Sequence, residues 1–327
     1  MPFAARLFAI LLALASTLAL AAPAPAGALT IGIADQKPDM FSDPLFHAAQ
    51  IPVARIAVGW DVLSNPTSLA SLDAWLAGAQ QANVEPLISF GHSGLERRKL
   101  PTPEQYVAAF KQFRARYPWV RDFATWNEAN HCGEPTCHRP QLVAAYYRGL
   151  RRACPTCRIL AAEVLDMPNM VSWVKDFTRA ARVKPRLWGL HNYIDANRGQ
   201  TLGTRRLLAA TSGQIWLTET GGIVSRTNRK RVTFPESATH AATATRFLFQ
   251  RLIPLSRRIT RVYIYHWNIE HRGGTWDSAL IGPRGHLRPA FKVVAQQLRV
   301  QAARAAARKA PAPLAPPSPP AAPFPTS

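Results

Sequence analysis

Residues 122–128 read DFATWNE and residues 214–219 read QIWLTE. Each stretch begins as a short run of apolar, β-branched and aromatic residues, which is typical of a buried strand. Each run stops at a glutamate, Glu128 in the first and Glu219 in the second. The two runs therefore predict two strands that each carry a carboxylate at the carboxyl end.

The chain on both sides of these runs alternates short apolar stretches with longer amphipathic ones, the pattern of βα units around a parallel sheet. Eight stretches are predicted as strands: Leu29–Ala34, Ala54–Val58, Val84–Ser89, Asp122–Trp126, Ile159–Glu163, Leu187–Asn192, Gln214–Thr218 and Thr260–Tyr265. Eight strands are the number that a closed (β/α)₈ barrel, or TIM barrel, needs.

Helices are predicted between most of these strands, at Leu69–Ala82, Pro103–Arg116, Pro140–Ala153, Val171–Ala181, Leu202–Ala210, Ser237–Leu255 and Pro289–Val300. The segment after the first strand contains Pro38, Pro44 and Pro52, so a loop with one helical turn is expected there. A doubly wound open sheet has the same alternation, but it needs a glycine-rich phosphate loop after its first strand. Residues 33–40 read IADQKPDM and lack that loop, so the barrel is favoured.

The two ends of the chain depart from this alternation. Residues 1–28 have a basic start, an apolar run over Leu7–Ala22 and small residues suited to cleavage, which predicts a secretory signal peptide. The apolar run is shorter than the roughly 20 residues that span a bilayer, so a retained membrane anchor is the weaker alternative. Residues 301–327 are dominated by Pro and Ala and are predicted to be a disordered tail, which leaves residues 29–300 as one barrel domain.

The chain is strongly basic, with 40 Lys and Arg against 19 Asp and Glu and a formal net charge of +21. Such a balance can attract nucleic acid or acidic glycans, because the summed charge concentrates counter-ions. The arginines are scattered over the predicted helices, and no nucleic-acid-binding motif is present. We therefore expect a solvated basic surface and no nucleic-acid partner.

Four cysteines occur as C-x₄-C (Cys132, Cys137) and C-x₂-C (Cys154, Cys157). One zinc ion would need all four together, yet a predicted helix of about 14 residues separates the pairs by roughly 20 Å. In an oxidising compartment we expect two local disulfides, Cys132–Cys137 and Cys154–Cys157, since bridged Cα atoms lie within about 7 Å. Free thiols, or a distorted helix that brings all four cysteines together, are the alternatives.

The carboxyl ends of the strands form one face of a barrel, so Glu128 and Glu219 are predicted to face one pocket. Cleavage of a glycosidic bond needs such a pair, one acid to protonate the leaving oxygen and one carboxylate to attack the sugar or to activate water. Carboxyl groups about 5–5.5 Å apart favour retention of stereochemistry, and about 6.5–9.5 Å favours inversion.

Trp126-Asn127-Glu128 at the end of the fourth strand, with Glu219 ending the seventh, resembles the retaining glycoside hydrolases of clan A, also called the 4/7 superfamily. The resemblance extends over residues 54–292. It implies that Glu128 is the general acid/base, that Glu219 is the nucleophile and that Asn127 binds the 2-hydroxyl of the sugar.

Five further residues take part in the resemblance and imply substrate-binding or supporting roles. Arg55 resembles the arginine that contacts the nucleophile, and His92 lies where several members place a sugar-contacting histidine. His191 and Tyr193, in residues 188–193 (WGLHNY), resemble an H-x-Y element whose tyrosine holds the nucleophile. Trp267 matches the tryptophan that stacks on the cleaved sugar.

The two glutamates would need opposite environments. Burial or a neighbouring negative charge should keep Glu128 protonated near neutral pH, whereas Arg55 should keep Glu219 ionised. This chemistry needs no metal and no cofactor, and we expect neither.

These residues predict a secreted, monomeric retaining β-glycosidase that acts on an extracellular or cell-envelope polysaccharide or oligosaccharide, with no stable membrane insertion after signal cleavage. An exo-acting glycosidase and a transglycosylase would use the same pair. Two other classes stay open: a catalytically silent carbohydrate-binding barrel, and a basic envelope-binding or nucleic-acid-binding structural protein. The last class would require arginines clustered on one face, away from the barrel mouth. The loops that select a sugar vary freely on this scaffold, so the sequence does not specify the sugar or the linkage.

Overall fold

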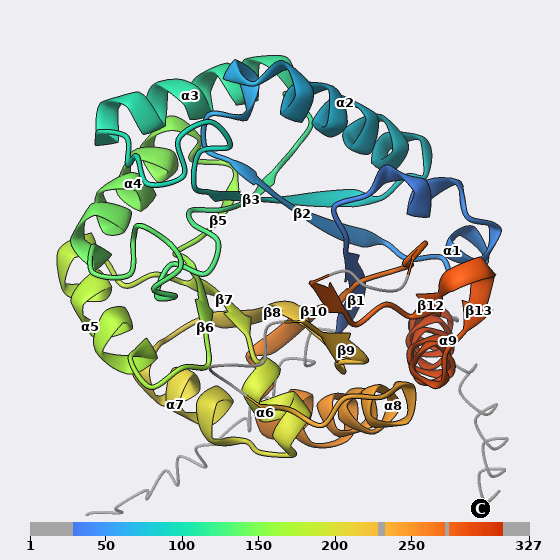
Figure 1. The fold of residues 1–327 in the computed structure, drawn as a ribbon. Helices are drawn as coiled ribbons and strands as arrows, with labels where there is room; N and C mark the ends of the chain where they lie inside the picture. The colour runs from blue at the N-terminus through green and yellow to red at the C-terminus, as the bar shows by residue number, and fades with distance from the viewer. Residues whose placement is uncertain (1–28, 228–232, 272–274, 310–327) are drawn as a thin grey trace, which may run out of the picture.

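The chain forms a single (β/α)₈ barrel, in a computed structural model that describes residues 29–227, 233–271 and 275–309. The predicted signal peptide and residues 310–327 lie outside the described residues. A ring of helices surrounds a ring of strands, and the chain runs around the barrel in sequence order (Figure 1).

Nine parallel strand segments build the barrel wall: β1 Thr30–Ala34, β2 Val53–Gly59, β3 Glu85–Gly91, β4 Asp122–Ala124, β5 Arg158–Leu160, β6 Glu163–Leu165, β7 Leu187–His191, β8 Gln214–Thr220 and β10 Ile259–Tyr265. Their hydrogen-bonded order is β5-β4-β3-β2-β1-β10-β8-β7-β6. The two end segments, β5 and β6, are halves of the predicted fifth strand. Around the break, Ala161 N–H donates to the Leu187 carbonyl and Glu163 N–H donates to the Trp126 carbonyl, so the ring closes. All eight predicted strands are confirmed.

The helices that cover the wall are α2 Pro66–Gln81, α3 Pro103–Arg116, α4 Pro140–Ala153, α5 Met170–Ala181, α7 Leu202–Ala210, α8 Ala238–Phe247 and α9 Pro289–Lys309. The segment after β1 forms a 3₁₀ turn and the short α1 Pro44–Ala48, as expected for a proline-rich loop. Proline suits the first turn of a helix because its missing N–H has no partner there anyway. A short helix that the sequence did not predict, α6 Tyr193–Arg198, follows β7 directly.

Two predicted boundaries are wrong. The helix expected over Ser237–Leu255 ends its α-helical part at Phe247 and continues as a π-helical turn and a 3₁₀ turn, because Pro254 cannot continue an α-helix. The disordered tail expected from Gln301 instead begins as helix, since α9 runs to Lys309. Alanine and arginine are strong helix formers, and the Gln301 side chain accepts a hydrogen bond of 3.0 Å from Ile31 N–H of β1.

The interior of the barrel is filled by alternate residues of the strands, as the two-residue period of a strand requires. This interior cluster contains Ala34, Val53, Leu87, Ala124, Leu160, Trp216 and Tyr263. A larger apolar cluster lies between the strands and the helices. Among the described residues, no helix is both long and apolar enough to cross a membrane.

Two small antiparallel ribbons lie at the carboxyl end of the barrel. One pairs β9, Ser225–Arg226, with β11, Trp276–Asp277. The other pairs β12, Ile281–Gly282, with β13, His286–Leu287. The first ribbon joins the loops after β8 and β10, and the second lies within the loop after β10.

Gly213 sets the position of β8 against β7, and we expect its substitution to destabilise the barrel. Its φ is +80°, and a Cβ there would collide with the Arg186 carbonyl oxygen, which accepts the Gln214 N–H at 2.8 Å. Gly213→Ala should lower the free energy of unfolding by about 2–4 kcal/mol, from left-handed strain plus overpacking. The measurement is urea-induced unfolding of wild type and variant.

Gly199→Ala is the matched control, because Gly199 has a φ of +62° and nothing lies within 4 Å of an added Cβ. This variant should lose only about 1–2 kcal/mol. Equal losses in the two alanine variants would contradict the close approach at Arg186.

Candidate active site

Arg55 of β2 lies at the centre of the carboxyl end of the barrel and is 2% exposed. Its Nε and Nη2 donate to both carboxylate oxygens of Glu163, at 2.8 and 2.7 Å. Its Nη1 donates to Glu219 at 2.8 Å, and its Nη2 also donates to the Asn127 side-chain oxygen at 2.6 Å. One buried guanidinium thus joins three strands of the barrel through charge-assisted hydrogen bonds.

Glu163 is fully buried at the start of β6. Burial alone would raise the pKa of this carboxyl, but the charge and hydrogen bonds of Arg55 outweigh burial and hold the pKa far below its ordinary value. The Ser89 hydroxyl donates a further hydrogen bond of 2.9 Å. Glu163 is therefore a permanent anion that fixes Arg55 in place.

Glu219 of β8 accepts hydrogen bonds on both of its oxygens. Arg55 donates to Oε2, and the Tyr193 hydroxyl donates to Oε1 at 3.0 Å. Tyr193 begins α6, the short helix that follows β7 directly. The carboxylate is thus oriented from two sides, and its side chain keeps 16% exposure toward the cavity.

Glu128 lies beyond the end of β4 and has a φ of 49°, in the left-handed region that L-residues with long side chains rarely adopt. Its carboxylate is 24% exposed and lies 3.2 Å from His191 Nδ1. The residue before it, Asn127, is held by its own backbone N–H, which donates to the Phe90 carbonyl at 2.6 Å. Strained backbone of this kind tends to occur at functional sites.

His191 at the end of β7 is fully buried between carboxylates. Burial would lower the pKa of this imidazole, but Glu219, Glu128 and Glu163 together raise it to about 9. Its Nε2 lies 3.7 Å from a Glu163 oxygen. At neutral pH His191 is therefore a cation that donates toward Glu128.

The sequence argument expected Glu128 to be protonated near neutral pH, but its surroundings favour the ionised carboxylate. Burial raises the pKa of Glu128, but the hydrogen bond and charge of His191 outweigh burial, with smaller contributions from the charges of His131 and Arg55, so the pKa falls below its ordinary value. The neighbours of this carboxyl are mainly cations, not the negative charge that the sequence argument invoked. In the free protein the proton lies on His191, within hydrogen-bonding distance of Glu128.

A cavity of about 380 Å³ opens above the two glutamates. Its wall combines Glu128, Glu219 and Tyr193 with residues that the sequence argument did not select: His131, Leu165, Asp166, Met167, Ile194, Arg226, Phe234, Tyr265 and Trp276. The Tyr193 and Trp276 rings meet edge to face, with centroids 4.9 Å apart. Several carboxylates opposite an aromatic wall suit a polar ligand with apolar faces.

Two of the predicted site residues lie away from this cavity. Trp267 is 1% exposed, its Nε1 donates to Asp43 at 2.8 Å, and its ring packs on Phe46. It therefore presents no surface to the cavity, and Tyr265, two residues earlier, lines the wall instead. His92 lies at the rim, where its Nδ1 is 2.8 Å from Glu134.

The structure contains two disulfides in the expected pairing, Cys132–Cys137 and Cys154–Cys157. The first closes the loop after Glu128, and Cys132 lines the cavity. The second lies between α4 and β5, at the opposite end of the barrel.

Glu163 and Asp166 are the carboxylates that the sequence argument missed. The predicted fifth strand already ended at Glu163, so a carboxylate at the same barrel edge was the available signal. Asp166 accepts the backbone N–H groups of Ile194 and Asp195 at 3.2 and 2.7 Å, and so anchors the first turn of α6. Burial raises the pKa of Asp166 to about 7, the charge of Asp195 adds to this rise, and the backbone donors oppose it.

Within the described residues, two groups bring side chains close enough to hold a metal ion: Glu128 with His191 and Glu219, and Cys132 with Cys137 and His138. The sulfurs of the second group are bonded to each other. In the first group, His191 Nδ1 lies 3.2 Å from Glu128, and Nε2 lies 3.4 Å from Arg55 Nη2 and 3.7 Å from a Glu163 oxygen. The first group is therefore arranged as a hydrogen-bonded cluster of charges.

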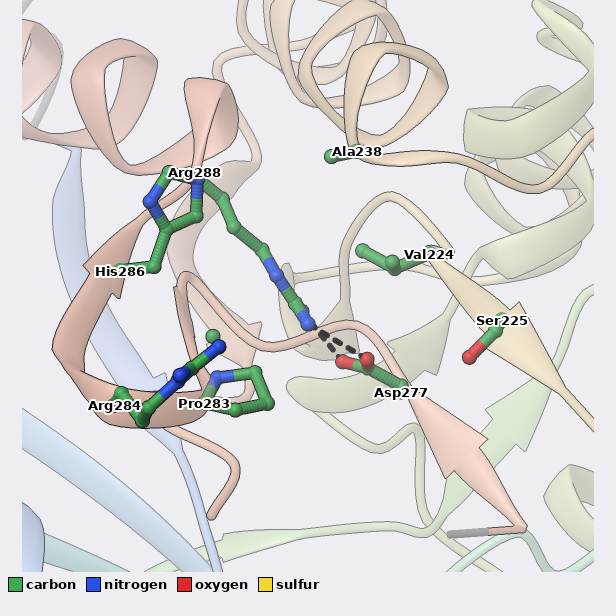
Figure 2. A pocket seen from close by; sticks show the side chains of 9 residues that line it. Val224, Ser225, Ala238, Asp277, Pro283, Arg284, His286 and Arg288 are labelled. Atoms are coloured by element: carbon green, nitrogen blue, oxygen red, sulfur yellow. Dashed lines mark hydrogen bonds and ion pairs between the residues drawn. The ribbon is translucent and has the colours of Figure 1, made fainter. Parts of the chain in front are cut away.

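A larger cavity, of about 780 Å³, lies behind the β9–β11 ribbon. Figure 2 shows Ser225 and Asp277 on its wall and the Arg288 guanidinium paired with the Asp277 carboxylate. Ser225 and Asp277 pair with each other in the ribbon, and the other pair, Arg226 and Trp276, lines the smaller cavity instead. We assign the active site to the smaller cavity, because none of the predicted site residues lines the larger one.

Removal of the Arg55 guanidinium should leave the buried charge of Glu163 without compensation. We expect Arg55→Met to lower the free energy of unfolding by about 3–5 kcal/mol, measured by urea denaturation. In the double variant Arg55→Met/Glu163→Leu the buried anion is gone, so the loss should be smaller. A double variant as unstable as the single one would show that Glu163 does not depend on Arg55.

The raised pKa of His191 makes stability depend on pH. The unfolded pKa is near 6.5 and the folded one about 9, so the protonated ring stabilises the fold fully below pH 6.5, and this stabilisation is lost as the pH rises through about 9. The free energy of unfolding of wild type should fall relative to that of His191→Gln by about 1.4 kcal/mol per pH unit across this window. Parallel curves for the two proteins would contradict a protonated His191.

No protein-family model matches the sequence, and no curated protein matches it. Among solved structures, the chain is similar to a glucosidase from Croceicoccus marinus, with a TM-score of 0.60 and 14% identity over 84% of this chain and 68% of that one. It is also similar to a fungal β-1,4-galactanase, with a TM-score of 0.58 and 12% identity over 82% and 99% of the two chains. A third similar structure is an α-L-arabinofuranosidase from Thermotoga maritima, with a TM-score of 0.57 and 13% identity over 80% of this chain and 63% of that one. The chain therefore has the (β/α)₈ barrel fold that these glycoside hydrolases share.

Proposed function

We propose that the protein is a secreted retaining β-glycosidase that hydrolyses O-glycosidic bonds of an extracellular or cell-envelope polysaccharide. The observation that carries the proposal is the pair of carboxylates in one cavity. Glu128 and Glu219 each contribute an oxygen to a cluster whose atoms lie within 4.8 Å of one another. This short spacing supports direct attack on the sugar, since an inverting pair stands about 6.5–9.5 Å apart to admit a water.

Glu219 has the surroundings of a nucleophile. Arg55 and Tyr193 both donate to its carboxylate and so orient its two oxygens. In the first step a Glu219 oxygen bonds to the anomeric carbon while the bond to the leaving oxygen breaks. The result is a covalent glycosyl-enzyme.

The Glu128–His191 pair supplies the proton for this step. In the free protein this proton lies on His191 Nδ1, 3.2 Å from Glu128, and Glu128 is the member that reaches the cavity. The proton moves from His191 Nδ1 to Glu128 and from Glu128 to the leaving oxygen. In the second step Glu128 takes a proton from the water that releases the sugar from Glu219 and returns it to His191.

The remaining contacts of the sugar follow from the cavity wall. The side chain of Asn127 turns its oxygen to Arg55, so its amide N–H groups are the donors available for a sugar hydroxyl. Tyr193, Tyr265 and Trp276 supply aromatic surface for the apolar face of the ring. His191 acts through Glu128, and Arg55 acts through Glu219.

Two further features support secretion and independent action. Both disulfides join near neighbours in the chain, and disulfides persist in oxidising compartments. One chain supplies both carboxylates and the aromatic wall, so the proposed monomer is complete without a second subunit.

The test of the function is release of reducing ends from a panel of β-glucans, mannans, xylans and galactans by the mature protein. We expect release from at least one polymer, with the β-anomer of the product formed first. Binding to a polymer without any release would favour the catalytically silent carbohydrate-binding barrel. First formation of the α-anomer would contradict retention.

Replacement of the nucleophile gives a prediction specific to the mechanism. Glu219→Ala should reduce turnover roughly a thousand-fold or more, and added azide should partly restore it by forming a glycosyl azide of inverted configuration. The matched control, Glu128→Ala, keeps the nucleophile, so any azide product should retain its configuration. An inverted azide product from Glu128→Ala would assign the roles the other way round.

A further inference from the structure

The amino ends of the strands, opposite the active site, carry a cavity of about 560 Å³ between two loops. One loop, residues 154–157, connects α4 to β5 and contains the Cys154–Cys157 disulfide. The other, residues 182–186, connects α5 to β7. The two helices lie side by side on the outside of the barrel (Figure 1), which brings their loops together. We call this cavity, with the two loops, the basic pocket.

The basic pocket gathers positive charge without acidic residues. Its loops and the chain next to them, residues 151–158 and 182–187, contain Arg151, Arg152, Arg158, Arg182, Lys184 and Arg186, and no aspartate or glutamate. Arg121, just before β4, also reaches this place, since its Nη1 donates to the Thr156 hydroxyl at 3.1 Å. A concave surface lined by one sign of charge concentrates counter-ions.

Most of these charges are available to a ligand. Arg158 is engaged, because it pairs with Glu85 and Asp122. Within the part of the chain that the structure describes, no ion pair is formed by Arg151, Arg182, Lys184 or Arg186. All four are exposed.

The arrangement fits a linear polyanion better than a small anion. Arg182, Lys184 and Arg186 alternate along one loop and are all exposed, and Lys184 and Arg186 line the cavity, so they match charges repeated along a chain. The aromatic side chain in the pocket wall, Tyr147, is 2% exposed, whereas proteins that bind single-stranded nucleic acid offer exposed aromatic rings for base stacking. The disulfide in the wall points to an oxidising compartment.

We propose that the basic pocket is a second glycan-binding site, which holds an acidic polysaccharide bearing carboxylate or phosphate groups and tethers the protein to it. The proposal rests on the proposed function for the glycan nature of the polymer, but not for the binding itself. The five residues of β7 separate the two faces by roughly 16 Å, so a polymer held here leaves the catalytic cavity open.

The test compares two variants of equal charge in the full mature chain, each carrying Glu219→Ala so that no probe is cleaved. The pocket variant is Arg182→Gln/Lys184→Gln/Arg186→Gln. The control is Lys111→Gln/Arg206→Gln/Lys292→Gln, three exposed cations on α3, α7 and α9. The probes are polygalacturonate, a phosphorylated mannan, a neutral β-glucan and single-stranded DNA, and the readout is the dissociation constant at several salt concentrations.

We expect the pocket variant to bind an acidic glycan at least about tenfold more weakly than the parent in low salt. The plot of the logarithm of the dissociation constant against the logarithm of the salt concentration should be less steep by about 2. The control should bind within twofold of the parent. The glycan that responds, carboxylated or phosphorylated, identifies the anionic group. Equal weakening by both variants would overturn the proposal, because net charge alone would then explain the binding. Tighter binding of DNA than of either acidic glycan would also overturn it.

Failure of the tether and failure of the catalytic proposal are distinguishable. The pocket substitutions, made in a chain that keeps Glu219, should leave reducing-end release from short soluble oligosaccharides unchanged. Absence of release from every polymer would count against the proposed glycosidase and leave the binding result standing.

Discussion

The ion pair between Arg55 and Glu163 is the interaction on which the rest of the site depends. A buried guanidinium and a buried carboxylate are each costly to remove from water. They are tolerated here because Nε and Nη2 of Arg55 donate to the two oxygens of Glu163. Once Arg55 is fixed, its remaining donors can orient Glu219 and Asn127 at the same time. Arg55 therefore orients Glu219 from inside the barrel, and Tyr193 of α6 orients it from the other side.

His191 extends this arrangement to the second glutamate. Three carboxylates and two cations share one small volume, so the protonation of each group depends on the others. The three carboxylates raise the pKa of the imidazole, and the hydrogen bond and charge of the protonated imidazole in turn lower the pKa of Glu128. Assigning a fixed charge to either residue by itself would misrepresent the pair.

The sequence could predict the barrel because its signals are local and repeated. Each strand has its own apolar run, and the long helices have their own patterns. The errors were therefore an end such as Gln301, the break in the fifth strand and the short α6, which was not predicted. The two glutamates were predictable because each ends an apolar run of the sequence that contains a buried strand. Their division of labour rested on resemblance to a family, and the charges around them came from neighbours distant in sequence.

Other features of the site could be recognised only in the folded structure. Nothing in the sequence indicates that Glu163 pairs with Arg55, which is 108 positions away. Trp267 was misplaced because its side chain turns outward to Asp43 after β10 ends, and no periodicity extends into that loop. The helix α6 is too short to show an amphipathic pattern, yet it places Tyr193 against Glu219.

At Glu128 the residue that suits the left-handed backbone best differs from the residue that the proposed function needs. Glycine is the residue that adopts such a conformation most easily, and glycine there would relax the chain while removing the carboxylate from the cavity. A search for more stable versions of this barrel would therefore tend to discard Glu128, along with the other left-handed residues that are not glycine. Thermal stabilisation of the protein has to come from positions elsewhere, such as the helix surfaces that face solvent.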